Sequence, residues 1–206
     1  MTMWQMWLFS KILAWNGYFC ITYAYDLQLL SPNVEETLDN CRKVKKDILQ
    51  RLRQLQEAGY NSFCVFGTSF GSLLALMIAN SSSAVSKIVL NLAGADLAEI
   101  VWSWDTVVKG FKSDLQRQNI TLPELKSSWK MLNAIYNSTN LQGKKILLYR
   151  SQGDELIPYE QGLKLIEYYK ERKYHFKVIT IRWLNHMLAF FFNLLRFKVY
   201  LDFLNS

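Results

Sequence analysis

The feature that most constrains the fold is a regular alternation between apolar runs of strand length and longer segments of helical character. Five apolar runs have the length and composition of buried strands, and they lie at residues 18–25, 62–66, 85–92, 145–149 and 176–181. Helical segments precede, separate or follow them, at residues 3–15, 33–58, 70–80, 159–172 and 187–204. Such alternation is typical of βαβ units. It predicts an α/β fold in which a mostly parallel sheet is flanked by helices.

One stretch, residues 97–140, breaks the alternation. It contains two or three helical patterns, with Trp102, Trp104 and Trp129 among them. We interpret this stretch as a small helical, cap-like insertion. Because 206 residues is the size of one domain, we predict a single domain over residues 1–206 that carries the insertion.

The net charge of +7 comes largely from one helical segment. Its basic residues are Arg42, Lys43, Lys45, Lys46, Arg51 and Arg53. No aromatic platform and no known nucleic-acid motif accompanies them, so we interpret this run as the solvent-facing side of a helix. The composition therefore indicates no nucleic-acid partner.

The C-terminal segment, residues 187–204, is rich in Phe and Leu but also contains Asn193, Arg196, Lys198 and Asp202. These polar groups are too many for a stable membrane span, so we predict a terminal helix packed on the sheet. Attachment to a lipid surface is the alternative, because an apolar helix with basic flanks can lie on lipid.

The three cysteines, Cys20, Cys41 and Cys64, form an odd number without a CxxC pair. Neither a disulfide framework nor a metal site is therefore indicated. A reducing, cytoplasmic location is the expectation that follows.

The sequence Gly67-Thr68-Ser69-Phe70-Gly71 matches the GxSxG pattern, in which a serine lies on a sharp turn between a strand and a helix. An apolar run precedes it and a helical segment of small residues follows, as the pattern requires. Side chains two residues before and after such a serine would collide with the neighbouring strand and helix, so glycine is favoured there. The pattern makes Ser69 the candidate nucleophile.

A serine nucleophile needs a base, normally an imidazole, and the chain has only two histidines. His175 opens the last apolar run, whereas His186 follows that run in a loop. Catalytic groups of parallel α/β sheets gather at the carboxyl ends of the strands. His186 is therefore the candidate base.

The base in turn needs a carboxylate that fixes its tautomer. Asp154 lies just past the carboxyl end of the run 145–149 and is the candidate acid. Asp96, which follows the run 85–92, is the reserve acid, and Asp26 is interpreted as a loop or structural carboxylate.

The segments GTSFG, RSQGDELIP and WLNHM, in this order and spacing, resemble the nucleophile, acid and histidine segments of the α/β-hydrolase superfamily. The resemblance extends over about residues 3 to 203. It implies a serine hydrolase that cleaves a carboxylic ester or thioester through an acyl-enzyme, with the Phe70 backbone N–H in the oxyanion hole. It implies no metal and no organic cofactor. The superfamily includes esterases, lipases, thioesterases and peptidases, and a tryptophan-rich cap favours a small, apolar acyl or aryl substrate.

The chain departs from this family pattern at its start. The second oxyanion donor of such enzymes comes from a loop before the first long helix, and a strand between the runs 18–25 and 62–66 belongs to the same region. If residues 3–15 are the first helix, this sequence has no counterpart of that loop or of that strand. A truncated start, an unusual strand order, or completion by a second protomer in a homo-oligomer would explain this departure. The alternative function is a non-catalytic binding or interaction module.

Overall fold

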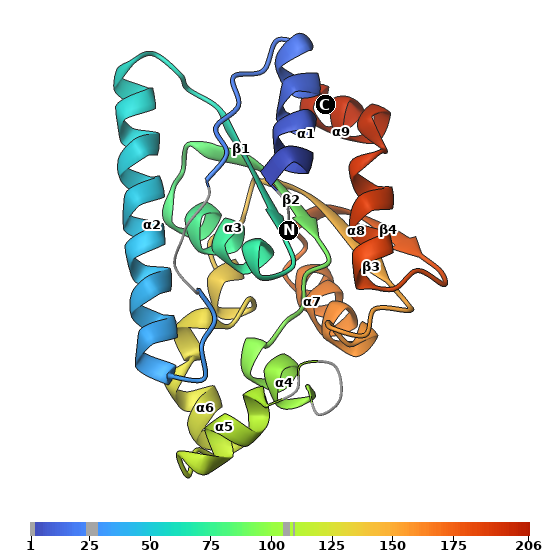
Figure 1. Ribbon diagram of the computed structural model, residues 1–206. Coiled ribbons are helices and arrows are strands. Elements are labelled where there is room, and N and C mark those ends of the chain that lie inside the picture. Colours follow the sequence, from blue (N-terminus) through green and yellow to red (C-terminus); the bar gives the residue numbers. More distant parts are fainter. Residues whose placement is uncertain (1–2, 24–28, 105–107, 109) are drawn as a thin grey trace.

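A four-stranded parallel sheet forms the centre of the protein (Figure 1). The computed structural model describes residues 3–23, 29–104, 108 and 110–206. In sheet order, which is also chain order, the strands are β1 (Phe63–Thr68), β2 (Val85–Asn91), β3 (Lys145–Ser151) and β4 (His175–Ile181). All three neighbouring pairs are parallel. The predicted parallel sheet is therefore confirmed for the runs that begin at residues 62, 85, 145 and 176.

One face of the sheet is covered by the helices that connect its strands and by the long helix before them. These helices are α2 (Val34–Glu57), α3 (Phe70–Ser81) and α7 (Tyr159–Glu171). Their apolar side chains pack on Ile88, Leu90, Ile146 and Leu148 of the two central strands. Alternate residues of a strand point to opposite faces, so these four form one side of a sheet that is buried on both.

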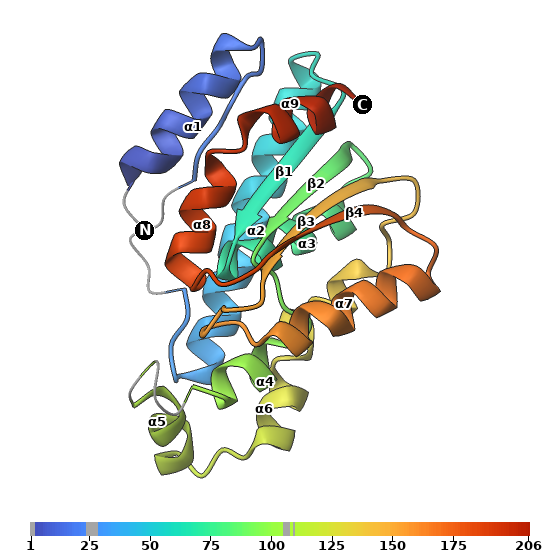
Figure 2. The same cartoon turned by 90° about the vertical axis from the view of Figure 1, so that its right-hand side faces the viewer.

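The opposite face is covered by helices from the two ends of the chain, as Figure 2 shows. These helices are α1 (Met3–Trp15), α8 (His186–Leu194) and α9 (Phe197–Asn205). The intervening strand residues Val89, Leu147 and Tyr149 pack here with Phe190 of α8 and Tyr200 of α9. The two ends of the chain are thus joined through one apolar layer.

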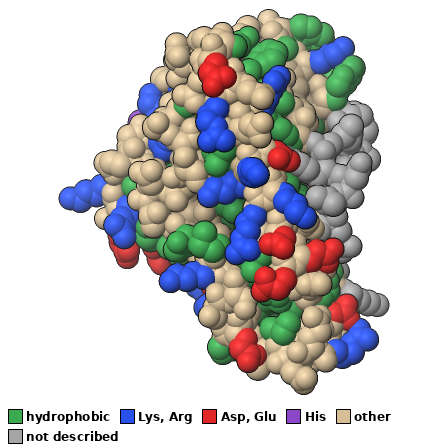
Figure 3. All heavy atoms as spheres, turned by 90° about the vertical axis from the view of Figure 1, so that its left-hand side faces the viewer, with side chains coloured by type: hydrophobic (Ala, Val, Ile, Leu, Met, Phe, Trp, Pro, Cys, Tyr) green, Lys and Arg blue, Asp and Glu red, His purple; other side chains and the backbone are tan. Residues whose placement is uncertain are grey.

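Helix α2 begins after a capping residue and has the solvent-facing basic side that the sequence predicts. The Asn33 side chain accepts a hydrogen bond from the Glu36 backbone N–H (3.2 Å), and Gly59, with φ +95°, lies just beyond the last turn. Leu38, Cys41, Val44, Leu52 and Leu55 are buried. The basic residues lie largely on the exposed side, where Lys and Arg side chains gather along the α2 face of the molecule (Figure 3).

The described part of residues 97–140 contains short helices beyond the carboxyl ends of the strands (Figures 1 and 2). They comprise α4 (Leu97–Trp102), α5 (Phe111–Arg117), α6 (Leu122–Ser128) and two 3-10 turns, Lys130–Leu132 and Tyr136–Ser138. Trp129 is almost fully buried, and its Nε1 donates to the Val34 backbone oxygen (3.2 Å). The indole therefore joins this region to the start of α2.

The predicted strand at residues 18–25 is wrong over its described part, because residues 18–23 form no strand; residues 24 and 25, like Asp26, lie outside the described residues. Phe19 is 61 % exposed, with its ring stacked on Tyr60 at the surface. The Tyr18 hydroxyl donates to Asn205 Oδ1 (2.6 Å). An aromatic run forms a strand only where a neighbouring strand and a covering layer are present, and this segment has neither among the described residues.

The single terminal helix predicted over residues 187–204 is also wrong. Helix α8 ends at Leu194, α9 begins at Phe197, and Arg196 between them has φ −84° and ψ 47°, outside the helical region. Leu194 and Tyr200 are both buried on the same sheet face. The break allows both helices to follow that face, a tertiary requirement that local propensity does not reveal.

Among the described residues, no helix combines the length and apolar character needed to cross a membrane. Cys20, Cys41 and Cys64 are all free.

Glu99 of α4 holds the region of short helices against the body of the protein. Its carboxylate accepts hydrogen bonds from Lys126 Nζ of α6 (2.7 Å) and from Lys164 Nζ and Gln161 Nε2 (2.7 Å) of α7. The Glu99 side chain is 25 % exposed. The two lysines, Lys126 foremost, lower the pKa of Glu99 from 4.5 to about 2.

This lowered pKa predicts a pH-dependent contribution to stability. Because the folded-state pKa is below the unfolded one, the contribution is present above about pH 4.5 and is lost as the pH falls towards 2. Solvent screening of the exposed lysines limits it to about 1 kcal/mol. Urea unfolding of E99Q should show this loss at pH 7 and a smaller one at pH 3. E171Q, at an exposed glutamate, is the matched control. Equal losses in the free energy of unfolding for E99Q at pH 7 and pH 3 would contradict the role given to Glu99.

Candidate active site

Ser69 lies on a strained turn between β1 and α3. Its backbone angles, φ 53° and ψ −126°, lie in a region that residues other than glycine rarely adopt. The Ser69 N–H donates to the Asn91 carbonyl oxygen (2.8 Å). The Ser72 hydroxyl donates to the carbonyl oxygens of Gly67 (2.9 Å) and Asn91 (3.1 Å). The bonds to Asn91 tie the turn to the end of β2, and the bond to Gly67 joins the start of α3 to the end of β1.

The two glycines of the GxSxG pattern differ in their steric roles. A Cβ atom on Gly67 would lie 2.1 Å from the Gly71 carbonyl oxygen and 2.7 Å from Ser72 Cα, so only glycine fits. A Cβ atom on Gly71 would meet nothing within 4 Å, and its φ is not positive. The predicted steric requirement is therefore correct for Gly67 and wrong for Gly71, which faces open space.

Asp154 and His186 form a buried hydrogen-bonded pair. His186 Nδ1 lies 2.8 Å from Asp154 Oδ2 and 2.9 Å from Oδ1, and the two side chains are 5 % and 3 % exposed. The backbone N–H groups of Leu156 (2.9 Å) and Ile157 (2.8 Å) also donate to Asp154 Oδ1. An ionised carboxylate only accepts hydrogen bonds, so Nδ1 carries the proton of the neutral ring and Nε2 remains free to accept one.

Glu155 is a site residue that the sequence reasoning missed. Its Oε2 accepts a hydrogen bond from the His186 backbone N–H (2.8 Å) at the start of α8. A carboxylate is favoured there because the first N–H groups of a helix lack helical partners. The signal for Glu155 in the sequence was that an acidic residue follows Asp154 directly.

The parallel register brings the three candidate segments to one edge of the sheet. Thr68, which precedes Ser69, pairs with Asn91, while Ser151 of β3 pairs with Ile181 of β4. The loops after β3 and β4 then pack together, since the Ser151 hydroxyl donates to the Leu184 carbonyl oxygen.

Among the described residues, no hydrogen bond joins the Ser69 hydroxyl to the imidazole of His186. Such contacts are often long in ligand-free enzymes and shorten when substrate binds.

The other candidates lie elsewhere. Asp96 caps α4 by accepting from the Glu99 N–H (3.2 Å), and its Oδ2 lies 3.5 Å from Lys126 Nζ. This reserve acid is therefore engaged in structure rather than with a histidine. His175 is exposed at the first residue of β4, at the end of the sheet away from Ser69.

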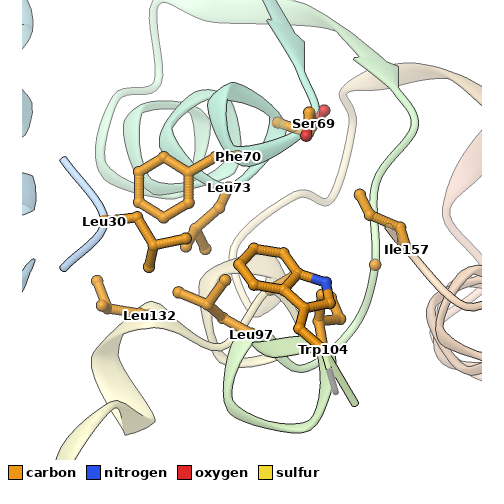
Figure 4. Close-up of a pocket in the computed structure, with 12 residues that line it drawn as sticks. Leu30, Ser69, Phe70, Leu73, Leu97, Trp104, Leu132 and Ile157 are labelled. Carbon is orange, nitrogen blue, oxygen red and sulfur yellow. The ribbon is translucent and has the colours of Figure 1, made fainter. Parts of the chain in front are cut away.

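An apolar pocket opens beside Ser69 (Figure 4). It has about 450 Å³ of empty space including its mouth, and its walls include Leu30, Phe70, Leu73, Leu97, Trp104, Leu132 and Ile157. Trp104 Nε1 donates to the Leu156 carbonyl oxygen (2.8 Å), which orients the indole as a wall of the pocket. Phe70 is also the first residue of α3, so its backbone N–H has no partner within the helix.

The sequence profile of the prolyl oligopeptidase family matches residues 38–203. The chain belongs to this family. A search of curated protein sequences found no match. The prolyl oligopeptidase match covers every strand, Ser69, Asp154 and His186, and begins within α2.

Solved structures with the same fold include members of the α/β-hydrolase class. The esterase B of Lactobacillus rhamnosis is 15 % identical, with a TM-score of 0.64 over 95 % of this chain and 69 % of its own. The acylaminoacyl peptidase of Pyrococcus horikoshii is 14 % identical, with a TM-score of 0.61 over 79 % of this chain and 27 % of its own. A puromycin-hydrolysing peptidase of Mycobacterium tuberculosis is 14 % identical, with a TM-score of 0.57 over 69 % of this chain and 22 % of its own.

These comparisons confirm the α/β-hydrolase fold that the three sequence segments predicted. The three solved structures are named as an esterase and two peptidases, and their likeness to this chain is one of fold. The chain spans only about a quarter of the length of these two peptidases. Among the described residues, no group of three His, Cys, Asp or Glu side chains is placed to hold a metal ion.

The contrast between the two glycines gives a direct test of the turn. G67A places a methyl group against backbone atoms, which cannot move aside, and should lower the free energy of unfolding by about 2 kcal/mol or more. G71A meets open space and should change it by less than about 1 kcal/mol, because the added methyl group contacts nothing and alanine favours a helix more than glycine does. Urea unfolding of both variants measures the difference. Equal destabilisation would contradict the geometry of the turn.

Proposed function

We propose that Ser69, His186 and Asp154 are the nucleophile, general base and orienting acid of a serine hydrolase that cleaves carboxylic esters or thioesters. The observation that carries the proposal is the buried hydrogen bond between Asp154 and His186 Nδ1, at the edge of the sheet where Ser69 lies on its strained turn. Family membership supports the serine-hydrolase class.

In the first half of the reaction, Ser69 Oγ attacks the carbonyl carbon while His186 Nε2 accepts its proton. The oxyanion that forms is stabilised by the Phe70 N–H at the positive end of α3. When the tetrahedral intermediate collapses, the bond to the leaving group breaks, and the imidazolium returns the proton to the departing oxygen or sulfur. The Asp154 carboxylate stabilises the imidazolium throughout.

In the second half, water attacks the acyl-enzyme and His186 accepts a proton from the water. Breaking the bond to Ser69 Oγ then releases the carboxylic acid, and the serine recovers its proton from the imidazolium. The groups named supply every proton and bond of the cycle, so the proposed reaction needs no cofactor.

The pocket beside Ser69 supports an apolar acyl group as the part of the substrate that the protein recognises. Its lining side chains are aliphatic or aromatic apart from the serines, and apolar walls favour apolar groups through the burial of surface. Residues 97–140 supply Leu97, Trp104 and Leu132 to these walls. We propose that this region is the cap of a single-domain enzyme.

Covalent labelling with a fluorophosphonate tests the assignment. The folded wild-type protein should be labelled, S69A should not, and H186A should react at least about a hundredfold more slowly because the serine loses its base. D154N should also react slowly, since the imidazole loses its orienting carboxylate. Mass spectrometry of the labelled peptide identifies the modified residue.

S127A is the matched control, because Ser127 is an exposed serine on α6. Labelling that persists in S69A, or a folded wild-type protein that does not react at all, would refute the proposal. The second result would favour the non-catalytic binding module.

Trp104 should set the preference for acyl-chain length. W104A removes the broadest wall of the pocket and should lower kcat/KM for a hexanoate ester about tenfold while changing that for an acetate ester little. W104F keeps an apolar ring and should retain most of the preference. W15A, at an indole that is 79 % exposed, is the control. Equal losses on both esters in W104A would show that the wall does not contact the acyl chain.

A further inference from the structure

Two buried asparagines connect the strand beside the nucleophile to the helix that begins with His186. Asn193 Nδ2 donates to Asn91 Oδ1 (2.6 Å), and both residues are 0 % exposed. They are 102 residues apart in the sequence. Asn91 is the last residue of β2, and Asn193 lies near the end of α8.

Asn91 contacts both halves of the candidate site. Its backbone carbonyl oxygen accepts the hydrogen bond from the Ser69 N–H, while its side chain accepts the bond from Asn193. Asn193 follows His186 by seven residues, which is about two helical turns, so the two side chains lie on the same side of α8. Asn91 therefore holds the backbone of Ser69 and also the side of α8 on which His186 lies.

The pair is not explained by stability alone. Asn91 Nδ2 and Asn193 Oδ1 are buried without a hydrogen-bond partner among the described residues. The strand and the helix that carry the pair also contribute Val89, Phe190 and Leu194 to the apolar layer on one face of the sheet. A buried amide that is only partly hydrogen-bonded costs free energy relative to an apolar side chain of similar size.

The pair provides a directional contact between α8 and β2. Apolar contacts between α8 and the sheet are not directional, so they limit a small rotation of the helix, or a small slide along its axis, less sharply than a hydrogen bond does. A short hydrogen bond between two side-chain amides in a low-dielectric interior is confined to a narrow range of lengths and angles. A shift of α8 would move the imidazole of His186 relative to Ser69.

We propose that the Asn91–Asn193 hydrogen bond positions His186 against Ser69 by fixing the rotation and the axial placement of α8. The proposal rests on the proposed function for its catalytic consequence, and on the two buried amides for its structural one. Both asparagines are positioning residues, because neither is in contact with the reacting atoms.

The test removes both amides together. N91A/N193L replaces them with apolar groups, and the alanine leaves room for the leucine branch. The variant should unfold at the same temperature as the wild type or higher. Backbone hydrogen exchange in α8 should rise at least tenfold while that of β3 is unchanged. With the ester that the wild type cleaves best, kcat should fall at least tenfold and KM should change less than twofold.

N137A is the matched control, since Asn137 is another buried asparagine whose Nδ2 donates to the carbonyl oxygens of Met131 (2.8 Å) and Asn133 (2.9 Å). It should lower thermal stability without changing exchange in α8 or the kcat of the folded enzyme. If N91A/N193L does not fold, N193S removes the direct bond with a smaller change and has the same expected exchange and kcat.

The two proposals fail in different ways. A wild-type protein without hydrolytic activity or labelling defeats the proposed function, and exchange in α8 still decides the structural part. Unchanged exchange in α8 of the variant overturns the positioning role, whatever the activity. An active variant with looser α8 but wild-type kcat overturns it as well.

Discussion

The hydrogen bond between Asp154 and His186 joins the loops that follow β3 and β4, together with the bond from the Ser151 hydroxyl to the Leu184 carbonyl oxygen. Two backbone N–H groups hold the Asp154 carboxylate, which in turn holds the His186 ring. Glu155 accepts the hydrogen bond from the His186 backbone N–H, so His186 is held through both its ring and its backbone. Since the pair is buried, loss of Asp154 would leave the Nδ1–H of His186 without its acceptor, which costs free energy. The start of α8, and through it the apolar layer on that face of the sheet, therefore depends on this polar contact.

Much of the fold was predictable because the residues that specify it are local. Continuous apolar runs identified β1 to β4 to within two residues at every end, and the predicted helical segment 33–58 matches α2. The order of Ser69, Asp154 and His186 could also be read along the chain. These features follow from composition and spacing over short windows, where periodicity and turn chemistry are informative.

The features that the sequence did not reveal depend on contacts between distant segments. The run at residues 18–23 has a strand-like composition but no neighbouring strand in the described part of the chain. The open space at Gly71 depends on what lies opposite α3, and the break at Arg196 on the shape of the sheet. Likewise, Asn91 and Asn193 are ordinary polar residues until the fold places them together. No pattern within one element encodes such relations.

The position of β1 has a consequence for the turn that it carries. Within the part of the chain that the structure describes, β1 has one strand neighbour, β2, whereas β2 and β3 each have two. Strands bonded on one side open locally at a lower free-energy cost than central strands do. Ser69 thus follows one of the two outer strands of this sheet, and His186 follows the other, β4, so heat inactivation would begin with local melting at these outer strands while β2 and β3 are still folded.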